Sequence, residues 1–268
     1  MKSINKFFIS SSFILVFTFL SLGILLGKSL FANPKVTQYN KDPLKGMVIV
    51  EFPTKKYRLK LLTATQFKLK QNLSAKDWVE KFNLIAAINA GMYQEDHKTS
   101  VGYLIAEGHK NNGHLGRDNA ILAFDPKESG IPSIQIIDRT CQSFKDLKPK
   151  YNSFLQGIRM ITCDQKNTWE KGGKKWPTAA LAINKNKNVL FIFSIEPRTP
   201  HDFINLVLNL PHPVHNMMYL EGGPPAQVYL KTKIQEIDLS GQRSSAVAKT
   251  GKPMRLPIPN VIGVIARN

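Results

Sequence analysis

The sequence is poor in cysteine: its 268 residues include only Cys141 and Cys163. No CxxC pair and no cluster of His and Cys accompanies them, which argues against a zinc site built from such ligands. If the domain is exported, as its uncharged N-terminal stretch predicts, the two thiols are expected to pair, because the compartments outside the cytoplasm are oxidising. The sequence leaves open the alternative of two free, buried thiols.

Acidic residues are scarce: 19 Asp and Glu stand against 37 Lys and Arg, a formal net charge of +18. This excess favours a polyanionic partner, such as an anionic polymer of the cell envelope. The basic residues are dispersed in short groups, however, as on an ordinary solvated surface. The sequence also lacks zinc-finger spacing, an aromatic RNA-binding signature and a helix-turn-helix pattern, so we expect no specific nucleic-acid binding.

Charge is absent from one long stretch, Phe7 to Gly27, which is rich in Phe, Leu and Ile and follows Lys2 and Lys6. A basic start followed by an apolar run of about 20 residues is typical of a secretory signal or a membrane anchor. We expect residues 1–32 to be such a segment. Cleavage after Ala32 and retention of the apolar run in the membrane are the two alternatives. The remainder is expected outside the cytoplasm, as a periplasmic, secreted or membrane-anchored protein.

No Ser/Gly-rich or Pro-rich linker and no internal repeat divides the remaining chain. We therefore predict a linker at 33–45 and one domain from 46 to 268. Short apolar or alternating segments predict strands, the first two forming an antiparallel hairpin. The predicted strands are Gly46–Glu51, Tyr57–Thr63, Leu84–Ile88, Val101–Ala106, Ala120–Phe124, Ser133–Ile137, Ser153–Ile161, Thr178–Ile183, Val189–Ser194, Met217–Leu220, Gln227–Leu230 and Val261–Ile265.

Helices are few. Ser74, with Asp77 three residues later, predicts the capped start of a short amphipathic helix. Thr199 followed by Pro200 predicts a second helix, which Pro211 terminates. Because strands outnumber helices, we predict an α+β fold with a mixed, mainly antiparallel sheet and a few flanking helices.

Two of the predicted strands end in polar loops that contain glycine. One loop is Asn89-Ala90-Gly91-Met92-Tyr93, and the other is Leu220-Glu221-Gly222-Gly223-Pro224-Pro225. Glycine permits a positive φ or a close approach of the backbone to a ligand. Polar groups on loops that rigid strands hold are usual ligand-binding positions. Either loop alone is also compatible with an ordinary turn.

Five motifs in this order resemble the phosphodiester glycosidase family, from about Phe82 to Val264. They are Ala87-Ile88-Asn89-Ala90-Gly91-Met92-Tyr93, Val101-Gly102-Tyr103-Leu104, Gln156-Gly157-Ile158-Arg159-Met160-Ile161, Ala179-Ala180-Leu181-Ala182-Ile183 and Tyr219-Leu220-Glu221-Gly222-Gly223-Pro224. The resemblance implies a hydrolase that breaks the bond between an anomeric carbon and a phosphate oxygen. Glu221 stands where many members carry Asp, and Pro225-Ala226 where many carry serines.

Such a reaction develops positive charge on the sugar and negative charge on the departing phosphate. We assign Glu221 to the first charge, Arg159 to the phosphate through bidentate hydrogen bonds, and Asn89 to a hydrogen bond with the substrate. Further residues are expected to shape the substrate site or to contact the substrate: Gly91, Tyr93, Gly102, Arg117, Gln156, Gly222 and Gly223.

The remaining candidates have weaker signals. Asp96 and His97 follow the first motif and could contact a divalent metal, with a solvated loop as the alternative. Trp169 and Trp176 flank a Lys/Gly-rich loop and are interpreted either as a sugar-stacking lip or as packing residues. Surface or structural positions are expected for the other polar candidates: His114, Asp118, His201, His212 and His215.

Two other functions compete with hydrolysis. The first is a protein of the same fold that binds an envelope polymer without turnover, and the second is salt-sensitive nucleic-acid binding. Hydrolysis of a sugar-1-phosphodiester would separate the enzyme from the binding protein.

Overall fold

The structure is a computed structural model, and it describes residues 33–211, 213–242 and 255–267. The predicted signal or anchor at 1–32 lies outside the described residues, and so does His212. Within the described ranges, no helix is long and apolar enough to cross a membrane.

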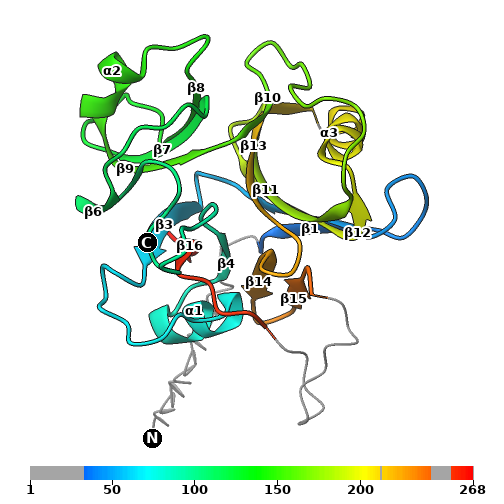
Figure 1. Cartoon of the computed structure of the whole chain (residues 1–268), viewed down its shortest axis with the longest axis horizontal. Helices are drawn as coiled ribbons and strands as arrows, with labels where there is room; N and C mark the ends of the chain where they lie inside the picture. Colours follow the sequence, from blue (N-terminus) through cyan, green and yellow to red (C-terminus); the bar gives the residue numbers. More distant parts are fainter. Residues whose placement is uncertain (1–32, 212, 243–254, 268) are drawn as a thin grey trace, which may run out of the picture. The chain divides into compact units, whose positions relative to one another are not determined.

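The described strands form three antiparallel sheets (Figure 1). Sheet 1 contains, in order, β1 (Lys35–Tyr39), β2 (Met47–Phe52), β12 (Val189–Arg198), β11 (Trp176–Asn184), β13 (Val214–Gly222) and β10 (Arg159–Ile161). Sheet 2 contains β15 (Glu236–Ser240), β14 (Gln227–Lys231), β4 (Ala86–Asn89), β16 (Asn260–Ala266) and β3 (Tyr57–Thr63). Sheet 3 contains β6 (His109–Asn112), β5 (Leu104–Ala106), β9 (Tyr151–Gly157), β7 (Ala120–Pro126) and β8 (Ile134–Asp138).

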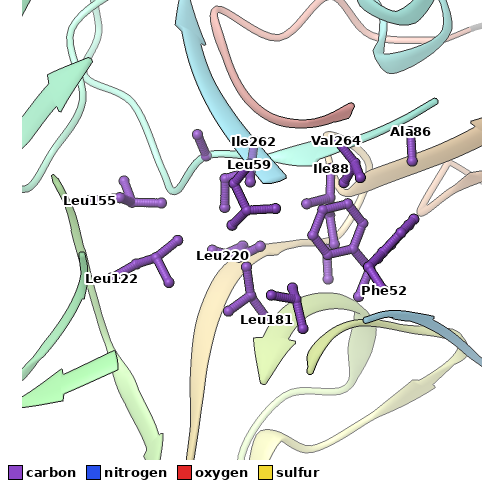
Figure 2. Packing of buried hydrophobic residues seen from close by; sticks show 14 of the residues in the cluster. Phe52, Leu59, Ala86, Ile88, Leu122, Leu155, Leu181, Leu220, Ile262 and Val264 are labelled. Atoms are coloured by element: carbon purple, nitrogen blue, oxygen red, sulfur yellow. The ribbon is translucent and has the colours of Figure 1, made fainter. Parts of the chain in front are cut away.

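The inner faces of the three sheets share one hydrophobic core, because alternate residues of each strand point to the same side. Figure 2 shows side chains from each sheet meeting there. Sheet 1 contributes Phe52, Leu181 and Leu220; sheet 2 contributes Leu59, Ala86, Ile88, Ile262 and Val264; and sheet 3 contributes Leu122 and Leu155.

A helix packs on the outer face of each sheet. The helices are α1 (Ala75–Phe82) on sheet 2, α3 (Pro200–Leu208) on sheet 1 and the single turn α2 (Phe144–Leu147) on sheet 3, which continues into the 3-10 turn η1 (Lys148–Lys150). The capping predictions are confirmed: Ser74 and Asp77 form a capping box, and the Thr199 hydroxyl accepts a hydrogen bond from the Asp202 amide. The predicted α+β class with mainly antiparallel pairing is confirmed as well.

The predicted hairpin of the first two strands is wrong. β2 pairs with β1 and β12 in sheet 1, whereas β3 pairs with β16 in sheet 2, so the turn at residues 53–56 passes from one sheet to the other. An alternating pattern identifies the buried face of a strand but not its partner. The boundary at residue 46 also differs from the structure: β1 lies in the stretch expected as a linker and pairs along its whole length with β2.

The segment predicted as one strand, Ser153–Ile161, divides between two sheets. β9 pairs with β7 in sheet 3, and β10 pairs with β13 in sheet 1. Ile158 lies between the two strands, and its carbonyl accepts a hydrogen bond from the Tyr219 amide at 2.8 Å. This crossing brings the Gln156–Arg159 motif beside β13, the strand that carries Glu221 as its second-last residue.

Candidate active site

Glu221 lies at the end of β13 and is only 7% exposed. Its Oε1 accepts a hydrogen bond from the Gly222 amide at 2.9 Å. None of the ion pairs in the described part of the chain includes Glu221. Burial therefore raises the pKa of Glu221 to about 7, although the Gly222 amide acts to lower it. A carboxyl group that titrates near neutral pH suits acid, base or nucleophilic chemistry.

Two tyrosine side chains, Tyr93 and Tyr219, lie near this carboxyl group. Burial raises the pKa of Tyr93 and of Tyr219, and the charge of nearby Glu221 raises both further. The Trp169 ring lies 5.7 Å from the Tyr219 ring, centroid to centroid. Two predicted residues of the substrate site, Tyr93 and Glu221, are thus brought together, and Trp169 extends the aromatic wall beyond Tyr219.

Gly222 occupies a position where no side chain fits. A Cβ atom there would lie 2.1 Å from the Tyr219 Oη and 2.4 Å from the Trp176 Nε1. Gly223 has a φ of 69°, a left-handed conformation that favours glycine, and its amide donates to the Pro177 carbonyl. The Gly-Gly pair therefore lets two polar aromatic groups approach the backbone next to Glu221.

Asn89, the last residue of β4, fastens the loop that follows Glu221. Its Nδ2 donates to the Pro225 carbonyl at 3.0 Å, and its Oδ1 accepts from the Gln227 amide at 2.6 Å. Asn89 is 1% exposed. The structure thus places this predicted substrate contact under the loop, where both ends of its amide bind the backbone.

Gln156 holds two loops in a similar way. Its Oε1 accepts from the amides of Tyr103 and Gly116, and its Nε2 donates to the carbonyls of Gly116 and Asp118. A Cβ at Gly102 would lie 2.8 Å from the Gln156 carbonyl oxygen. Gln156 and Gly102 therefore hold the loops at 102–103 and 116–118 against β9.

The first motif turns sharply after Asn89. Gly91 has a φ of 75°, which redirects the chain toward Tyr93. The Tyr93 ring lies 5.8 Å from the His97 ring. The Asp96 carboxylate accepts hydrogen bonds from the Lys98 and Thr99 amides and the Thr99 hydroxyl, so it is occupied within its own turn.

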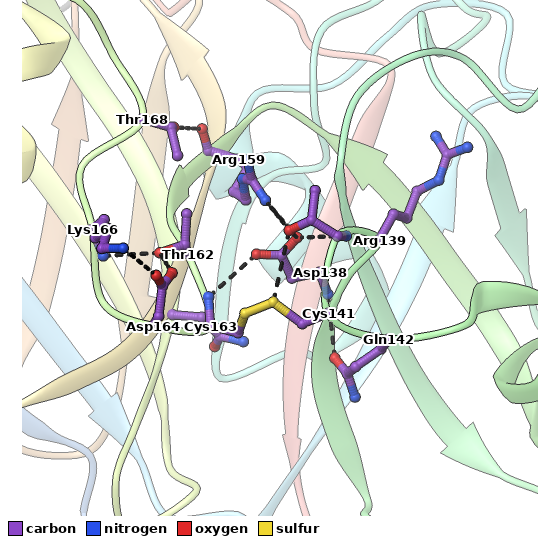
Figure 3. A network of polar contacts seen from close by, with 12 residues as sticks. Asp138, Arg139, Cys141, Gln142, Arg159, Thr162, Cys163, Asp164, Lys166 and Thr168 are labelled. Carbon is purple, nitrogen blue, oxygen red and sulfur yellow. Dashed lines mark hydrogen bonds and ion pairs between the residues drawn. A yellow bond between two sulfur atoms is a disulfide. The ribbon is translucent and has the colours of Figure 1, made fainter.

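Among the described residues, no hydrogen bond or ion pair joins Arg159 to Glu221. Its Nη1 donates to the Asp138 Oδ1 and to the Thr140 hydroxyl, each at 2.6 Å (Figure 3). Asp138 also accepts hydrogen bonds from Thr140 and from the Cys163 amide. Burial acts to raise the pKa of Asp138, but these hydrogen bonds outweigh it and hold the pKa below its usual range.

Sequence reasoning missed Asp138. The residue follows directly after a predicted strand, which was the available signal, but no glycine-rich loop or family motif accompanies it. Its side chain is 2% exposed and forms an ion pair with Arg159, the residue that we assigned to the phosphate from the sequence.

The predicted disulfide between Cys141 and Cys163 is present in the structure. It joins the loop after β8 in sheet 3 to the loop after β10 in sheet 1 (Figure 3). Asp138 and the two sulfurs are the one group of potential metal ligands among the described residues. Disulfide sulfurs are not thiolates, and one remaining carboxylate is too few donors for a divalent cation.

Arg117 lies on the exposed loop that Gln156 holds, and within the described ranges its guanidinium has neither a hydrogen bond nor an ion pair. A separate feature is an open groove beside Trp169 and Arg159. The groove is lined by Ile158, Arg159, Thr168, Trp169, Glu170, Lys171, Gly172 and Gly173.

The other polar candidates lie away from this cluster or on the surface. His114 and His215 are exposed, and His201 lies beside Asp202 at the start of α3. The Asp118 carbonyl accepts from Gln156, and its carboxylate makes no ion pair with any described residue.

Comparison with known proteins gives two kinds of match. A family model described as phosphodiester glycosidase matches residues 82–265. The catalytic domain of zebrafish N-acetylglucosamine-1-phosphodiester alpha-N-acetylglucosaminidase, auto-inhibited by its pro-peptide, is similar in structure, with a TM-score of 0.60 and 12% identity over 88% of this chain and 83% of that one. A hypothetical protein from Synechocystis has a TM-score of 0.56 and 12% identity, over 87% of this chain and 61% of that one. No curated protein matches the sequence.

Proposed function

Because this chain belongs to the phosphodiester glycosidase family, we propose that it is an exported hydrolase of a sugar-1-phosphodiester. The bond cleaved joins the anomeric carbon to a phosphate oxygen. The observation that carries the proposal is the buried carboxyl of Glu221, with a pKa raised to about 7, at the end of β13 beside Tyr93 and Tyr219.

Glu221 acts in this reaction as a carboxylate. When the C1–O bond breaks, the bonding electrons leave with the phosphate oxygen and positive charge develops at the anomeric carbon. An ionised Glu221 stabilises that charge or attacks the carbon directly, and water then supplies the new C1 hydroxyl. A phosphate monoester is already a good leaving group, so one carboxylate suffices without a strong general acid.

The aromatic wall serves the same step. Tyr93 and Trp169 are half-buried and could pack their rings against a sugar, whereas the buried Tyr219 contributes to the desolvation of Glu221. In such a desolvated site a negative charge interacts more strongly with a developing positive charge than it would in water.

The phosphate is better served by Arg117 than by Arg159. Arg159 already donates from Nη1 to Asp138 and Thr140, whereas Arg117 lies on an exposed loop and is free of hydrogen bonds to any described residue. A free guanidinium can present its planar fork to two phosphate oxygens. We therefore assign the phosphate contact to Arg117, and to Arg159 a structural role in joining β10 to Asp138.

Two observations support export. The uncharged stretch Phe7 to Gly27 follows a basic start, and the Cys141–Cys163 disulfide suits an oxidising compartment. A reporter enzyme fused after Asn268 that works only in the cytoplasm would contradict this location.

The decisive experiment identifies the bond that breaks. Benzyl phosphodiesters of N-acetylglucosamine-1-phosphate and glucose-1-phosphate are incubated with the protein in ¹⁸O-labelled water, and the products are analysed by mass spectrometry. The proposal requires the label in the sugar and none in the benzyl phosphate. Glu221→Gln should lower turnover by about 10² to 10⁴-fold, whereas Glu128→Gln, at an exposed position, should leave it unchanged. Label in the phosphate product would indicate an ordinary phosphodiesterase.

A binding protein of the same fold without turnover is the second candidate, which the net charge of +18 favours. Retention of both phosphodiesters without any labelled product would support this candidate over the enzyme.

A further inference from the structure

A second concave surface lies on the outer face of sheet 2, and the proposed function does not use it. α1 ends at Phe82 because Asn83 takes a left-handed conformation with a φ of 49°. The chain then turns into β4, so the helix leaves one end of the sheet face uncovered. The resulting groove has a volume of about 1070 Å³, and its apolar floor includes Leu84, Ile85 and Ile265.

We call this surface the basic groove, because four cations line it: Arg58, Lys60, Lys231 and Lys233. Glu80 is the one acidic residue among its lining residues. Lys60 lies 4.0 Å from Glu107, and Arg58, Lys231 and Lys233 form no ion pair with the described residues. Glu236 lies opposite Lys231 on the neighbouring strand β15, but its carboxylate already forms an ion pair with Lys76 and accepts a hydrogen bond from the Tyr229 hydroxyl. The groove therefore keeps an excess of positive charge.

The cations form two banks. Arg58 and Lys60 alternate with buried residues on β3, so they share one face about 7 Å apart. Lys231 ends β14 and Lys233 follows it. β3 and β14 are separated by β16 and β4, which places the banks about 14 Å apart. A single phosphate cannot reach both banks, whereas a chain with repeated negative charges can.

The basic groove and the candidate active site lie at opposite ends of β4. Asn89, which fastens the loop after Glu221, is the last residue of this strand, and Ile85 in the groove floor precedes its first residue. Four residues of extended chain separate them by about 13 Å. The groove is thus a separate surface, close enough for one long ligand to reach both.

We propose that the basic groove binds a linear phosphate-bearing polymer, the same chain whose sugar-1-phosphodiester bonds are hydrolysed at Glu221. This inference rests on the proposed function. The repeated phosphates pair with the two banks of cations, and the apolar floor contacts the units between them. Binding at the groove keeps the polymer attached between cleavages and raises the local concentration of its bonds at the active site.

The test separates binding from turnover. Inorganic polyphosphate of several tens of units serves as the probe, and titration calorimetry measures its affinity for the full chain at two salt concentrations. The groove variant carries Arg58→Glu, Lys231→Glu and Lys233→Glu. The control variant carries Lys41→Glu, Lys127→Glu and Lys185→Glu, at three exposed positions outside the groove, so both have the same net charge.

We expect the groove variant to lose about tenfold or more of the affinity and the control variant to stay within about twofold of wild type. Turnover of a small benzyl phosphodiester should be equal in all three proteins. Equal loss in both variants would overturn the inference, since net charge alone would then explain binding, and so would wild-type protein that ignores polyphosphate. Groove-dependent retention on vesicles of anionic phospholipid that polyphosphate does not displace would also overturn it. Groove-dependent polyphosphate binding without any turnover would instead contradict the proposed hydrolase.

Discussion

Arg159 and Asp138 are joined by a hydrogen bond of 2.6 Å between Nη1 and Oδ1, and the two residues come from different sheets. Arg159 begins β10 in sheet 1, and Asp138 ends β8 in sheet 3. The Asp138 side chain is 2% exposed, so its negative charge depends on this partner and on the hydrogen bonds from Thr140 and Cys163. The pair connects two of the three sheets at the edge of the core.

Removing one member of this pair should destabilise the fold. Asp138→Ala leaves the partly buried Arg159 charge without its carboxylate partner, and we expect the free energy of unfolding to fall by about 3 kcal/mol. Urea unfolding monitored by fluorescence measures the change. Asp164→Ala is the matched control, because its ion pair with Lys166 is exposed on both sides and solvent screens it, so the loss of stability should be much smaller.

Variants of Arg117 and Arg159 are expected to change different properties, substrate binding for Arg117 and stability for Arg159. Arg117→Ala should lower kcat/KM for a sugar-1-phosphodiester by about tenfold or more and leave unfolding within about 0.5 kcal/mol of wild type. Arg159→Lys should lower the melting temperature, with turnover per folded molecule largely retained. Steady-state kinetics and thermal unfolding of both variants provide the comparison. Full stability with lost turnover in Arg159→Lys would return the phosphate to Arg159.

Glu221 should make stability depend on pH. Its pKa is raised from 4.5 to about 7 on folding, so the folded state holds the proton more tightly than the unfolded state. This contribution is fully present below pH 4.5 and is lost as the pH rises through 7. Glu221→Gln stays neutral, so it should match wild type at pH 4 and exceed it by about 3 kcal/mol above pH 7. Denaturant unfolding across this range measures the difference, and parallel stability curves would contradict the burial of Glu221.

A methyl group at Gly222 should disturb the site locally. In Gly222→Ala the new Cβ meets the Tyr219 hydroxyl and the Trp176 indole, which must both shift. We expect a stability loss of about 1 to 3 kcal/mol and a larger fall in turnover. Gly113→Ala is the control, since its Cβ would meet only the flexible Lys110 side chain. Activity and melting temperature measured together would show whether turnover falls more than folding does.

Reduction of the disulfide should lower the stability of the fold, and we expect no direct effect on Glu221. Cys141 and Cys163 are 22 residues apart, and a loop of this size contributes about 3 kcal/mol in the chain-entropy account. The Cys141→Ser/Cys163→Ser double variant should show this loss in unfolding experiments. Addition of dithiothreitol should then affect wild type and leave the double variant unchanged. Wild-type protein whose native thiols react freely with iodoacetamide would contradict the pairing.

The helices could be predicted because their signals are local. Ser74 with Asp77 and Thr199 with Pro200 satisfy backbone groups within a few residues, so the sequence specifies these starts without reference to the rest of the fold. The loops around Gly91 and Gly222 were located for the same reason, since glycine marks positions that need a positive φ, as at Gly91, or that leave no room for a side chain, as at Gly222.

Long-range relationships could not be predicted in this way. Apolar alternation in Tyr57–Thr63 does not reveal that β3 pairs with the C-terminal β16, nor does the continuous segment Ser153–Ile161 reveal its division between two sheets. Asn89 and Gln156 were expected to face substrate because of their motifs, but their amides bind the backbone of neighbouring loops. The partner of Arg159 was missed since Asp138 lies 21 residues away.

The clamp that Asn89 forms on the loop after Glu221 links catalysis to the docking of two sheets. Glu221 is carried by sheet 1, whereas the loop that follows it is fastened through Asn89 to sheet 2. A small slip of one sheet over the other would shift the loop from Pro225 to Gln227 relative to Glu221, while every strand remained paired. The packing of the shared core would then set the highest temperature at which the protein turns over substrate. This temperature would lie below the one at which the chain unfolds.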